Sequence, residues 1–191
     1  MVAAIILSAG KSERMGSPKA LLHFRGQTFL ATILTAIASA PIDQVVVVAG
    51  HHFDRISAAF PDIPVLFNPN YEQGMSTSVQ AGIRALPEGL DGAAVFLVDH
   101  PVIARGTINA LVDRLVPGSI VVPVCAGRRG HPVVFAADLF EEILTLSPDQ
   151  GLNTVVKRNR ARVVEVIVED EGVLRDIDTP EQFARLLGEN Q

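Results

Sequence analysis

The sequence predicts a three-layer, doubly wound α/β fold built on a mostly parallel sheet. Short apolar runs recur along the chain without the apolar and polar alternation of a strand that has one wet face. Amphipathic segments lie between these runs, as expected for helices that cover a sheet. The 191 residues are 48% hydrophobic and 19% charged, a globular balance that predicts one domain over residues 1–191.

The first strand and helix are predicted at the N-terminus. VAAIIL at 2–7 is a continuous apolar run, and in TFLATILTAIASA at 28–40 the residues Phe29, Ile33 and Ile37 recur on one helical face. In order along the chain, further strands are predicted at 44–50, 63–68, 93–99, 119–124, 132–137 and 162–168, and helices at 55–60, 78–86 and 179–187.

The segment after the first strand, SAGKSERMGSPK, is rich in glycine and cationic residues. It lacks the G-x-G-x-x-G spacing of a dinucleotide-binding loop, because the next glycine after Gly10 is Gly16. It also lacks the first glycine of a phosphate-binding P-loop, because that position is occupied by Ile5 inside the strand. Small residues let backbone N–H groups approach a polyphosphate, while Arg14 and Lys19 supply positive charge. The spacing therefore predicts a triphosphate loop, against the alternative of an ordinary surface loop. The pattern L-x-A-G-x-S-x-R-M-G-x-x-K is filled by Leu7, Ala9, Gly10, Ser12, Arg14, Met15, Gly16 and Lys19.

Asp99 ends the predicted strand at 93–99, whose other residues are apolar, and an acid in such a place needs a partner or a metal. Ligands of open parallel sheets bind beyond the carboxyl ends of the strands, where the strand order reverses. If the strands at 44–50 and 63–68 lie on one side of the first strand and 93–99 lies on the other, Asp99 faces the loop. Its alternative role is an N-cap for the following turn.

Composition excludes several classes of partner and site. The net charge of -5 and the absence of cationic runs argue against nucleic acid. Cys125 is the single cysteine, so no internal disulfide or cysteine cluster can form, which suits a reducing compartment. The opening apolar run lacks a basic flank and is far shorter than the ~20 residues of a membrane span. We expect a cytoplasmic protein without a membrane partner.

Five segments together carry a family resemblance: the loop above, GMSTSVQAGI, VDHP, GRRGHPVVF and DIDTPEQF. In their order and spacing the chain resembles the nucleotidyltransferase superfamily, which includes the molybdenum cofactor cytidylyltransferases and guanylyltransferases and the methylerythritol phosphate cytidylyltransferases. The cytidylyltransferases of molybdenum cofactor are the most similar branch. The resemblance implies a Rossmann-like nucleotidyltransferase fold and a magnesium-dependent transfer of a nucleoside monophosphate to a phosphorylated acceptor, with release of pyrophosphate.

The resemblance also implies site residues. Arg14, Lys19 and Asp99 would be catalytic, and Asp99 with Asp178 would hold Mg²⁺. Asp176 and Asp178 alternate in an extended segment and could face one side, but Asp178 could instead support a helix cap built from the TPEQ that follows it. The expected nucleotide-binding residues are Leu7, Ser8, Ala9, Gly10, Ser12, Gly16, Gly74 and Ser78.

The base is expected to be cytosine, which makes CTP the preferred nucleotide. Ala9 stands where related guanylyltransferases usually have glycine, and its methyl group narrows the approach of a purine. The segment Ser78-Val79-x-x-Gly82 resembles the serine-valine segment with which cytidylyltransferases read cytosine. Ser76 fits a helix cap nearly as well as a base contact.

The acceptor side is expected at Arg128 and His131 of GRRGHPVVF and at Asn153. The resemblance makes molybdopterin cofactor the favoured acceptor, with possible transfer of the product to a molybdoenzyme or its chaperone. His131 could equally be a structural loop residue. A sugar or polyol phosphate acceptor and a non-catalytic nucleotide-binding module stay open as alternatives.

Overall fold

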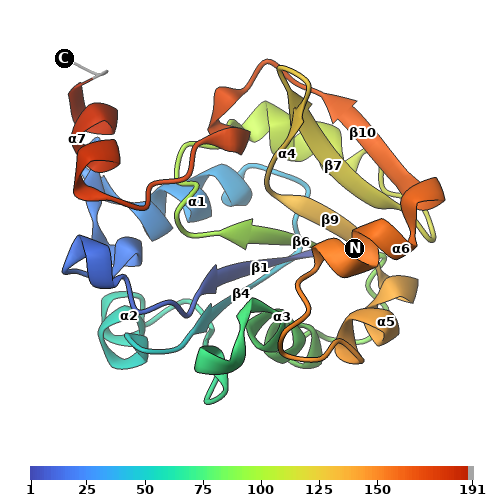
Figure 1. Cartoon of the computed structure of the whole chain (residues 1–191), viewed down its shortest axis with the longest axis horizontal. Helices are drawn as coiled ribbons and strands as arrows, with labels where there is room; N and C mark the ends of the chain where they lie inside the picture. Colours follow the sequence, from blue (N-terminus) through green and yellow to red (C-terminus); the bar gives the residue numbers. More distant parts are fainter. Residues whose placement is uncertain (189–191) are drawn as a thin grey trace.

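The computed structural model describes residues 1–188, and within them an eight-stranded sheet lies between two layers of helices (Figure 1). The strand order is β10-β7-β9-β6-β1-β4-β5, with β8 paired to β7. The strands of this sheet are β1 (Val2–Ser8), β4 (Gln44–Ala49), β5 (Val65–Phe67), β6 (Gly92–Leu97), β7 (Ile120–Cys125), β8 (Arg128–Arg129), β9 (Val133–Ala136) and β10 (Val163–Ile167). A separate hairpin is formed by β2 (His23–Phe24) and β3 (Gln27–Thr28). The helices are α1 (Phe29–Ala38), α2 (Phe53–Ala59), α3 (Met75–Arg84), α4 (Arg105–Val112), α5 (Phe140–Leu144), α6 (Asn153–Arg158) and α7 (Pro180–Gly188).

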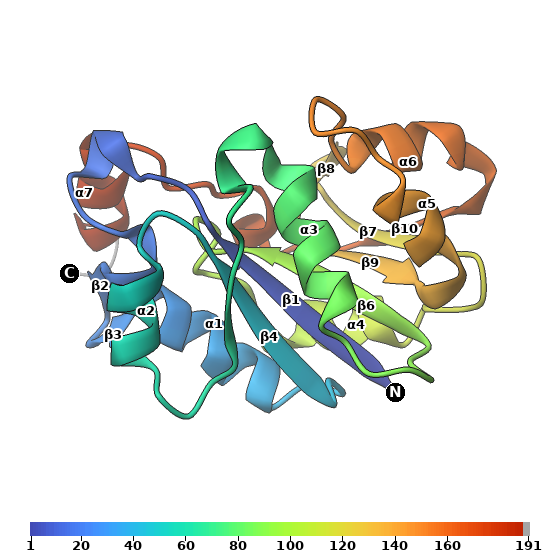
Figure 2. The ribbon, with the colours of Figure 1, turned by 90° about the horizontal axis from the view of Figure 1, so that it is seen from below.

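The two faces of the sheet are covered by different helices (Figure 2). Ile5 of β1 packs in one core cluster with Val79 of α3, and this cluster also takes in α5 and α6. The next residue, Ile6, belongs to the cluster with Ile33 of α1, which also includes α2 and α4. Both faces are therefore dry, which confirms the three-layer fold that the continuous apolar runs predicted.

The strand order reverses at β1. Both β4 and β6 run parallel to β1 and lie on its opposite sides, while β5 continues beyond β4. This is the predicted arrangement, and it brings the loop after β1 next to the residues that follow β6. Ligands are expected at this edge of the sheet.

Strand β9 runs antiparallel to both of its neighbours, β6 and β7. The chain leaves β7, turns at Ala126 and Gly127 with positive φ angles of 49° and 73°, and pairs β8 back onto β7. A connection this short permits an antiparallel return, whereas a parallel strand needs a long crossover. The sequence located this strand but did not reveal its direction.

The edge strands are less buried than their apolar sequences predicted. Phe67 at the end of β5 is 47% exposed and Ile167 at the end of β10 is 77% exposed, because each strand has a neighbour on one side only. The short helices α4, α5 and α6 were not predicted. Each spans eight residues or fewer and is too short to show a strong helical repeat.

The last helix begins with the predicted cap. The Gln182 N–H donates to Thr179 Oγ1 at 3.3 Å, and the Thr179 N–H donates to Gln182 Oε1 at 2.9 Å. This reciprocal pair is a capping box. Through residue 188, where the description ends, the chain has no helix with the length and apolar character needed to cross a membrane. The final residues 189–191 of the predicted domain lie outside the described part.

Candidate active site

The loop after β1 is held in shape by its own residues. Ser12 and Gly16 take the left-handed φ angles of 53° and 63°, which bend the chain on either side of a short 3₁₀ turn at Glu13–Met15. The Lys19 N–H then donates to Ser12 Oγ at 3.2 Å. The backbone of Lys19 is therefore tied to the start of the loop, while its side chain is left to reach elsewhere.

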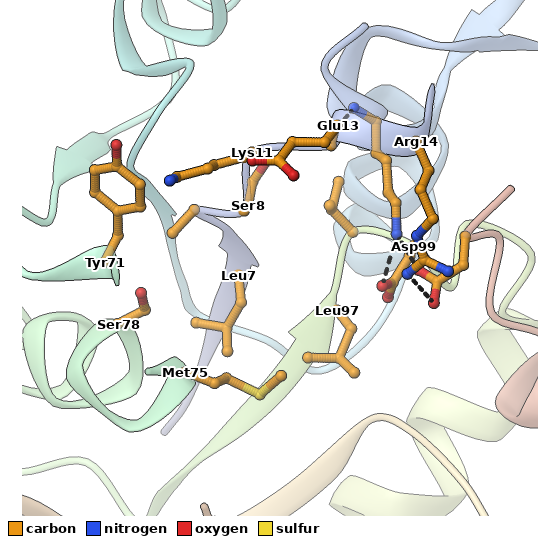
Figure 3. A pocket seen from close by; sticks show the side chains of 16 residues that line it. Leu7, Ser8, Lys11, Glu13, Arg14, Tyr71, Met75, Ser78, Leu97 and Asp99 are labelled. Atoms are coloured by element: carbon orange, nitrogen blue, oxygen red, sulfur yellow. Dashed lines mark hydrogen bonds and ion pairs between the residues drawn. The ribbon is translucent and has the colours of Figure 1, made fainter. Parts of the chain in front are cut away.

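A cavity of about 510 Å³ lies between this loop, the N-terminal part of α3 and the carboxyl end of β6. Such a volume is typical of a small-molecule site. Figure 3 shows Tyr71, Ser78 and Met75 on one side of the cavity and Arg14 with Asp99 at the other, with Leu7 between them. The sequence-predicted residues that line it are Leu7, Ser8, Ala9, Gly10, Ser12, Arg14, Lys19, Ser78, Asp99 and Asp178.

Two cations and two carboxylates meet at one end of the cavity. Lys19 Nζ lies 3.2 Å from Asp99 Oδ2 and also donates to Asp178 Oδ1. Arg14 Nη2 lies 3.3 Å from Asp178 Oδ2. The hydrogen bond from Lys19 holds the pKa of the Asp178 carboxyl below its usual value, against the opposing effect of burial. Residues from the start, middle and end of the chain thus form one charged cluster.

The side chains of Asp99 and Asp178 belong to this cluster, and neither acts as the helix or turn cap that the sequence left open as an alternative. The cap of α7 uses only the backbone of Asp178, whose N–H donates to Gln182 Oε1 at 2.8 Å. Asp176 is separated from Asp178 and lines a different cavity. Asp99 is tied to the same segment, since its carbonyl accepts a hydrogen bond of 2.9 Å from the Ile177 N–H.

The aspartate pair has the chemistry of a divalent-metal site. Asp99 Oδ1 is buried and has no hydrogen-bond partner among residues 1–188, so it keeps a hard oxygen available for a cation. Mg²⁺ is commonly held by one or two carboxylates together with substrate phosphate oxygens. In the described part of the chain no group of three or more His, Cys, Asp or Glu is arranged for a metal. The residues present therefore fit a metal that is shared with a phosphate ligand.

The opposite end of the cavity offers a directed hydroxyl. The buried Asn68 donates through Nδ2 to Ser78 Oγ and to Thr77 Oγ1, each at 2.9 Å. Because Ser78 accepts this bond, the hydrogen of its hydroxyl is available to an acceptor on a ligand. Ser76 has a different environment, since its hydroxyl faces the carbonyls of Ser147 and Pro148 at 3.5 and 3.4 Å. The N-cap of α3 is Gly74, so Ser76 lies within the first turn of the helix and is not its cap.

Two predicted nucleotide-binding glycines do not line the cavity. Gly16 ends the 3₁₀ turn of the loop at a positive φ. Gly74 has φ 136° and ψ 161°, and a Cβ built there would lie 2.3 Å from the Pro148 carbonyl oxygen. The missing side chain of Gly74 therefore allows a close approach to the loop before α6.

Six residues that line the cavity were not predicted as site residues from the sequence: Lys11, Glu13, Tyr71, Met75, Leu97 and Val98. Lys11 Nζ forms an ion pair of 2.6 Å with Glu72 Oε1, a hydrogen bond that raises the pKa of Lys11 and lowers that of Glu72. His52 Nε2 contacts the Lys11 carbonyl at 2.9 Å, and His51 Nδ1 contacts Tyr71 Oη at 3.2 Å. These contacts tie the loop to the residues before α2 and to the segment before α3. The position of Lys11 inside the glycine-rich loop was the one available signal.

The three predicted acceptor residues lie apart. His131 is close to the charged cluster, because its ring lies 5.4 Å from that of the buried His100, whose Nε2 is 4.0 Å from Asp99 Oδ1. Burial lowers the pKa of His131 to about 4. Arg128 lines a second cavity of about 440 Å³, together with Asp176 and Arg185. Asn153 begins α6, is exposed and lines neither cavity.

Comparison with known proteins yields a consistent family. Residues 4–163 match the MobA-like NTP transferase domain. The purine catabolism protein PucB of Bacillus subtilis is 31% identical, over 94% of this chain and 92% of PucB. The nicotine blue oxidoreductase of Paenarthrobacter nicotinovorans is 30% identical, over 97% of this chain and 96% of the relative.

The solved structures extend this likeness to the fold. Rv0371c of Mycobacterium tuberculosis superposes with a TM-score of 0.86 at 28% identity, over 98% of this chain and 97% of Rv0371c. A second structure of Rv0371c, described as a complex with manganese, has a TM-score of 0.81 at 26% identity and covers 98% of both chains.

Proposed function

This chain belongs to the MobA-like NTP transferase family, and on that premise we propose that it transfers CMP from CTP to a phosphorylated acceptor, with molybdopterin cofactor as the favoured one. The observation that carries the proposal is the cavity that has the Lys19, Arg14, Asp99 and Asp178 cluster at one end and the Ser78 hydroxyl at the other. The triphosphate would lie over the cluster and the base beside α3.

The loop supplies the charge that the reaction needs. An oxygen of the acceptor phosphate attacks the α-phosphorus, a new P–O bond forms, the bond to the β-phosphate breaks, and pyrophosphate leaves with the electron pair. Negative charge grows on the nonbridging and departing oxygens. Lys19 and Arg14 would stabilise these oxygens, and no side chain has to act as the nucleophile. The backbone N–H groups near Gly10 would position the phosphates.

Mg²⁺ would be held by Asp99 and Asp178 together with phosphate oxygens, and when bound it supplies further charge neutralisation on the triphosphate. The unpartnered Asp99 Oδ1 and the all-oxygen ligand pair support this assignment. The manganese complex of the relative Rv0371c is consistent with a divalent metal in this family.

The preference for CTP rests on two residues of the cavity. Ser78 can donate its hydroxyl hydrogen to an acceptor on the cytosine edge, because Asn68 already donates to its oxygen. The methyl group of Ala9, which lines the same cavity, reduces the room for a purine. A site whose buried polar group is paired by one base and left unpaired by another discriminates by about 1–3 kcal/mol.

For the acceptor we propose the side of the charged cluster that leads to His131 and Arg128. The second cavity begins at Asp176, two residues before Asp178, and combines Arg128 and Arg185 with the apolar side chains of Ile177 and Leu186. Arg175 and Glu171 also line this cavity, so it has three arginines against two acidic residues, which suits an anionic group carried on a less polar body. Asn153 would contribute only if its loop moved toward the cavity. Delivery of the product to a molybdoenzyme or its chaperone belongs to the same proposal.

The deciding experiment measures pyrophosphate release with CTP or GTP, Mg²⁺, and either molybdopterin cofactor or a panel of sugar and polyol phosphates. The expected result is release with molybdopterin cofactor and a kcat/KM about 5- to 150-fold higher for CTP than for GTP. Ala9→Gly and Ser78→Ala should each narrow this ratio. Equal use of CTP and GTP would refute the base assignment. Pyrophosphate release only with a sugar or polyol phosphate would refute molybdopterin cofactor as the acceptor. No pyrophosphate release with any acceptor would favour a non-catalytic nucleotide-binding module.

A further inference from the structure

We infer that Lys19 is an internal counter-ion that closes the divalent-metal site until a triphosphate draws its side chain away, so that metal and nucleotide enter together. This inference rests on the proposed function in one respect, the assignment of Asp99 and Asp178 as the metal-holding pair. It concerns the order of events at that pair and is independent of the base and the acceptor.

The first support is the position of the Lys19 ammonium group. It bonds to Asp178 Oδ1 and lies 3.2 Å from Asp99 Oδ2, so a single group touches both carboxylates. A metal ion held by both carboxylates would need the space that Nζ fills. The Lys19 side chain is 14% exposed and is thus enclosed at the cavity end. Metal and ammonium group compete for one position.

The second support is the charge of the cluster. Lys19 and Arg14 carry two positive charges against the two negative charges of Asp99 and Asp178, so the group as a whole is neutral. A neutral cluster attracts a hydrated divalent cation far less than a bare pair of carboxylates. Arg14 contributes less to the closure, because among the two aspartates its ion pair is with Asp178 and its side chain is 68% exposed.

The third support is the way in which Lys19 is anchored. Its N–H is bonded to Ser12 Oγ at 3.2 Å, and the following residue, Ala20, is completely buried. The backbone is therefore fixed, while the flexible four-carbon stem can turn. Phosphate oxygens in the same cavity offer the ammonium group a new anionic partner, and its departure exposes both carboxylates to the metal that accompanies the triphosphate.

The test is a titration of the full chain with Mn²⁺ alone, without nucleotide or acceptor. Electron paramagnetic resonance measures the concentration of free Mn²⁺ at each step of the titration. Lys19→Met should bind Mn²⁺ about tenfold more tightly than the unmodified chain, since a competing charge in direct contact has been removed. Lys11→Met is the matched control. It removes the same charge from the same loop, but its partner Glu72 lies outside the aspartate pair, so the Mn²⁺ affinity should change less than twofold.

A second pair of variants makes the result specific. Asp99→Asn in the Lys19→Met background should return the affinity to that of the unmodified chain, and Lys19→Arg, which keeps the charge, should stay weak. Lys19→Gln replaces Lys19→Met should the latter fail to fold. Mn²⁺ affinity that is unchanged in Lys19→Met, or raised equally in Lys11→Met, overturns the inference. Because the titration contains no nucleotide, it is read independently of whether the transfer assay succeeds.

Discussion

Replacing Gly74 with alanine tests whether the close contact between the start of α3 and the loop at Pro148 stabilises the fold. Gly74 precedes α3 with φ 136° and ψ 161°, a region of backbone conformation that is essentially restricted to glycine and costs other residues about 1–3 kcal/mol. The added Cβ would also lie 2.3 Å from the Pro148 carbonyl oxygen, a backbone atom that cannot turn aside. Overpacking of this kind costs about 1–3 kcal/mol. We therefore expect Gly74→Ala to lower the free energy of unfolding by about 4 kcal/mol.

The assay is urea unfolding followed by circular dichroism, with thermal unfolding beside it. A loss of about 4 kcal/mol corresponds to a fall in Tm of roughly 8–16 °C for a chain of this size. Gly106→Ala is the control, and its effect on the free energy of unfolding should have the opposite sign. Gly106 lies in α4 with no heavy atom within 4 Å of an added Cβ, so alanine should raise the stability by up to ~1 kcal/mol.

A stability of Gly74→Ala within about 0.5 kcal/mol of the unmodified chain would refute this reasoning, since surface substitutions without a special role stay in that range. It would mean that the loop at Pro148 yields to the new methyl group. The role of Gly74 would then have to be sought in the cavity, as first expected from the sequence, and the substitution should weaken CTP binding instead.

Two further predictions concern the charged cluster. Lys19→Ala should lower kcat about 10²–10³-fold at saturating CTP and acceptor, since Lys19 contacts the developing charge in the proposed reaction, and a near-normal kcat would exclude the lysine from that role. The second prediction concerns stability in acid, because Lys19 holds the pKa of Asp178 below its ordinary value of 3.8. The ionised Asp178 therefore stabilises the folded protein at pH values above 3.8, and this stabilisation is lost as the pH falls through the lowered pKa of the folded state. Asp178→Asn should therefore show a shallower loss of stability than the unmodified chain in urea unfolding from pH 6 to pH 3, and equal slopes would contradict the ion pair.

The meeting of Arg14, Lys19 and Asp99 at one end of the cavity was predictable, because each of its determinants is a local feature of the sequence. A buried strand, a loop with two glycines and three cationic residues, and an acid at the end of a second strand need only the reversal of strand order to meet. Asp178 was harder, because its sequence equally supports the cap of α7. Only the fold shows that the cap takes the backbone of this residue and leaves the carboxylate to Lys19.

The contacts between separate loops were not predictable in the same way. The Lys11 to Glu72 ion pair joins residues whose neighbours carry no shared pattern, and its formation depends on how two loops lie over the sheet. His100 and His131 come together for a similar reason, since β9 returns antiparallel beside β6 and brings His131 back to the residues that follow β6. A sequence reveals the residues of such pairs but not the topology that unites them.

The segment from Ser78 to Gly82 shows why a matched motif does not by itself identify a base. Ser78 lines the cavity, but Gly82 lies one helical turn further along α3, where an added Cβ would be 2.6 Å from Ile5 Cγ2 of β1. The glycine is required for α3 to pack closely on the central strand, a need that any member of this fold could share whichever nucleotide it uses. The resemblance at Gly82 therefore has a structural cause. The proposed preference for CTP rests instead on Ser78 and Ala9, which do line the cavity, and for this reason the comparison of CTP with GTP must be made on Ser78→Ala and Ala9→Gly.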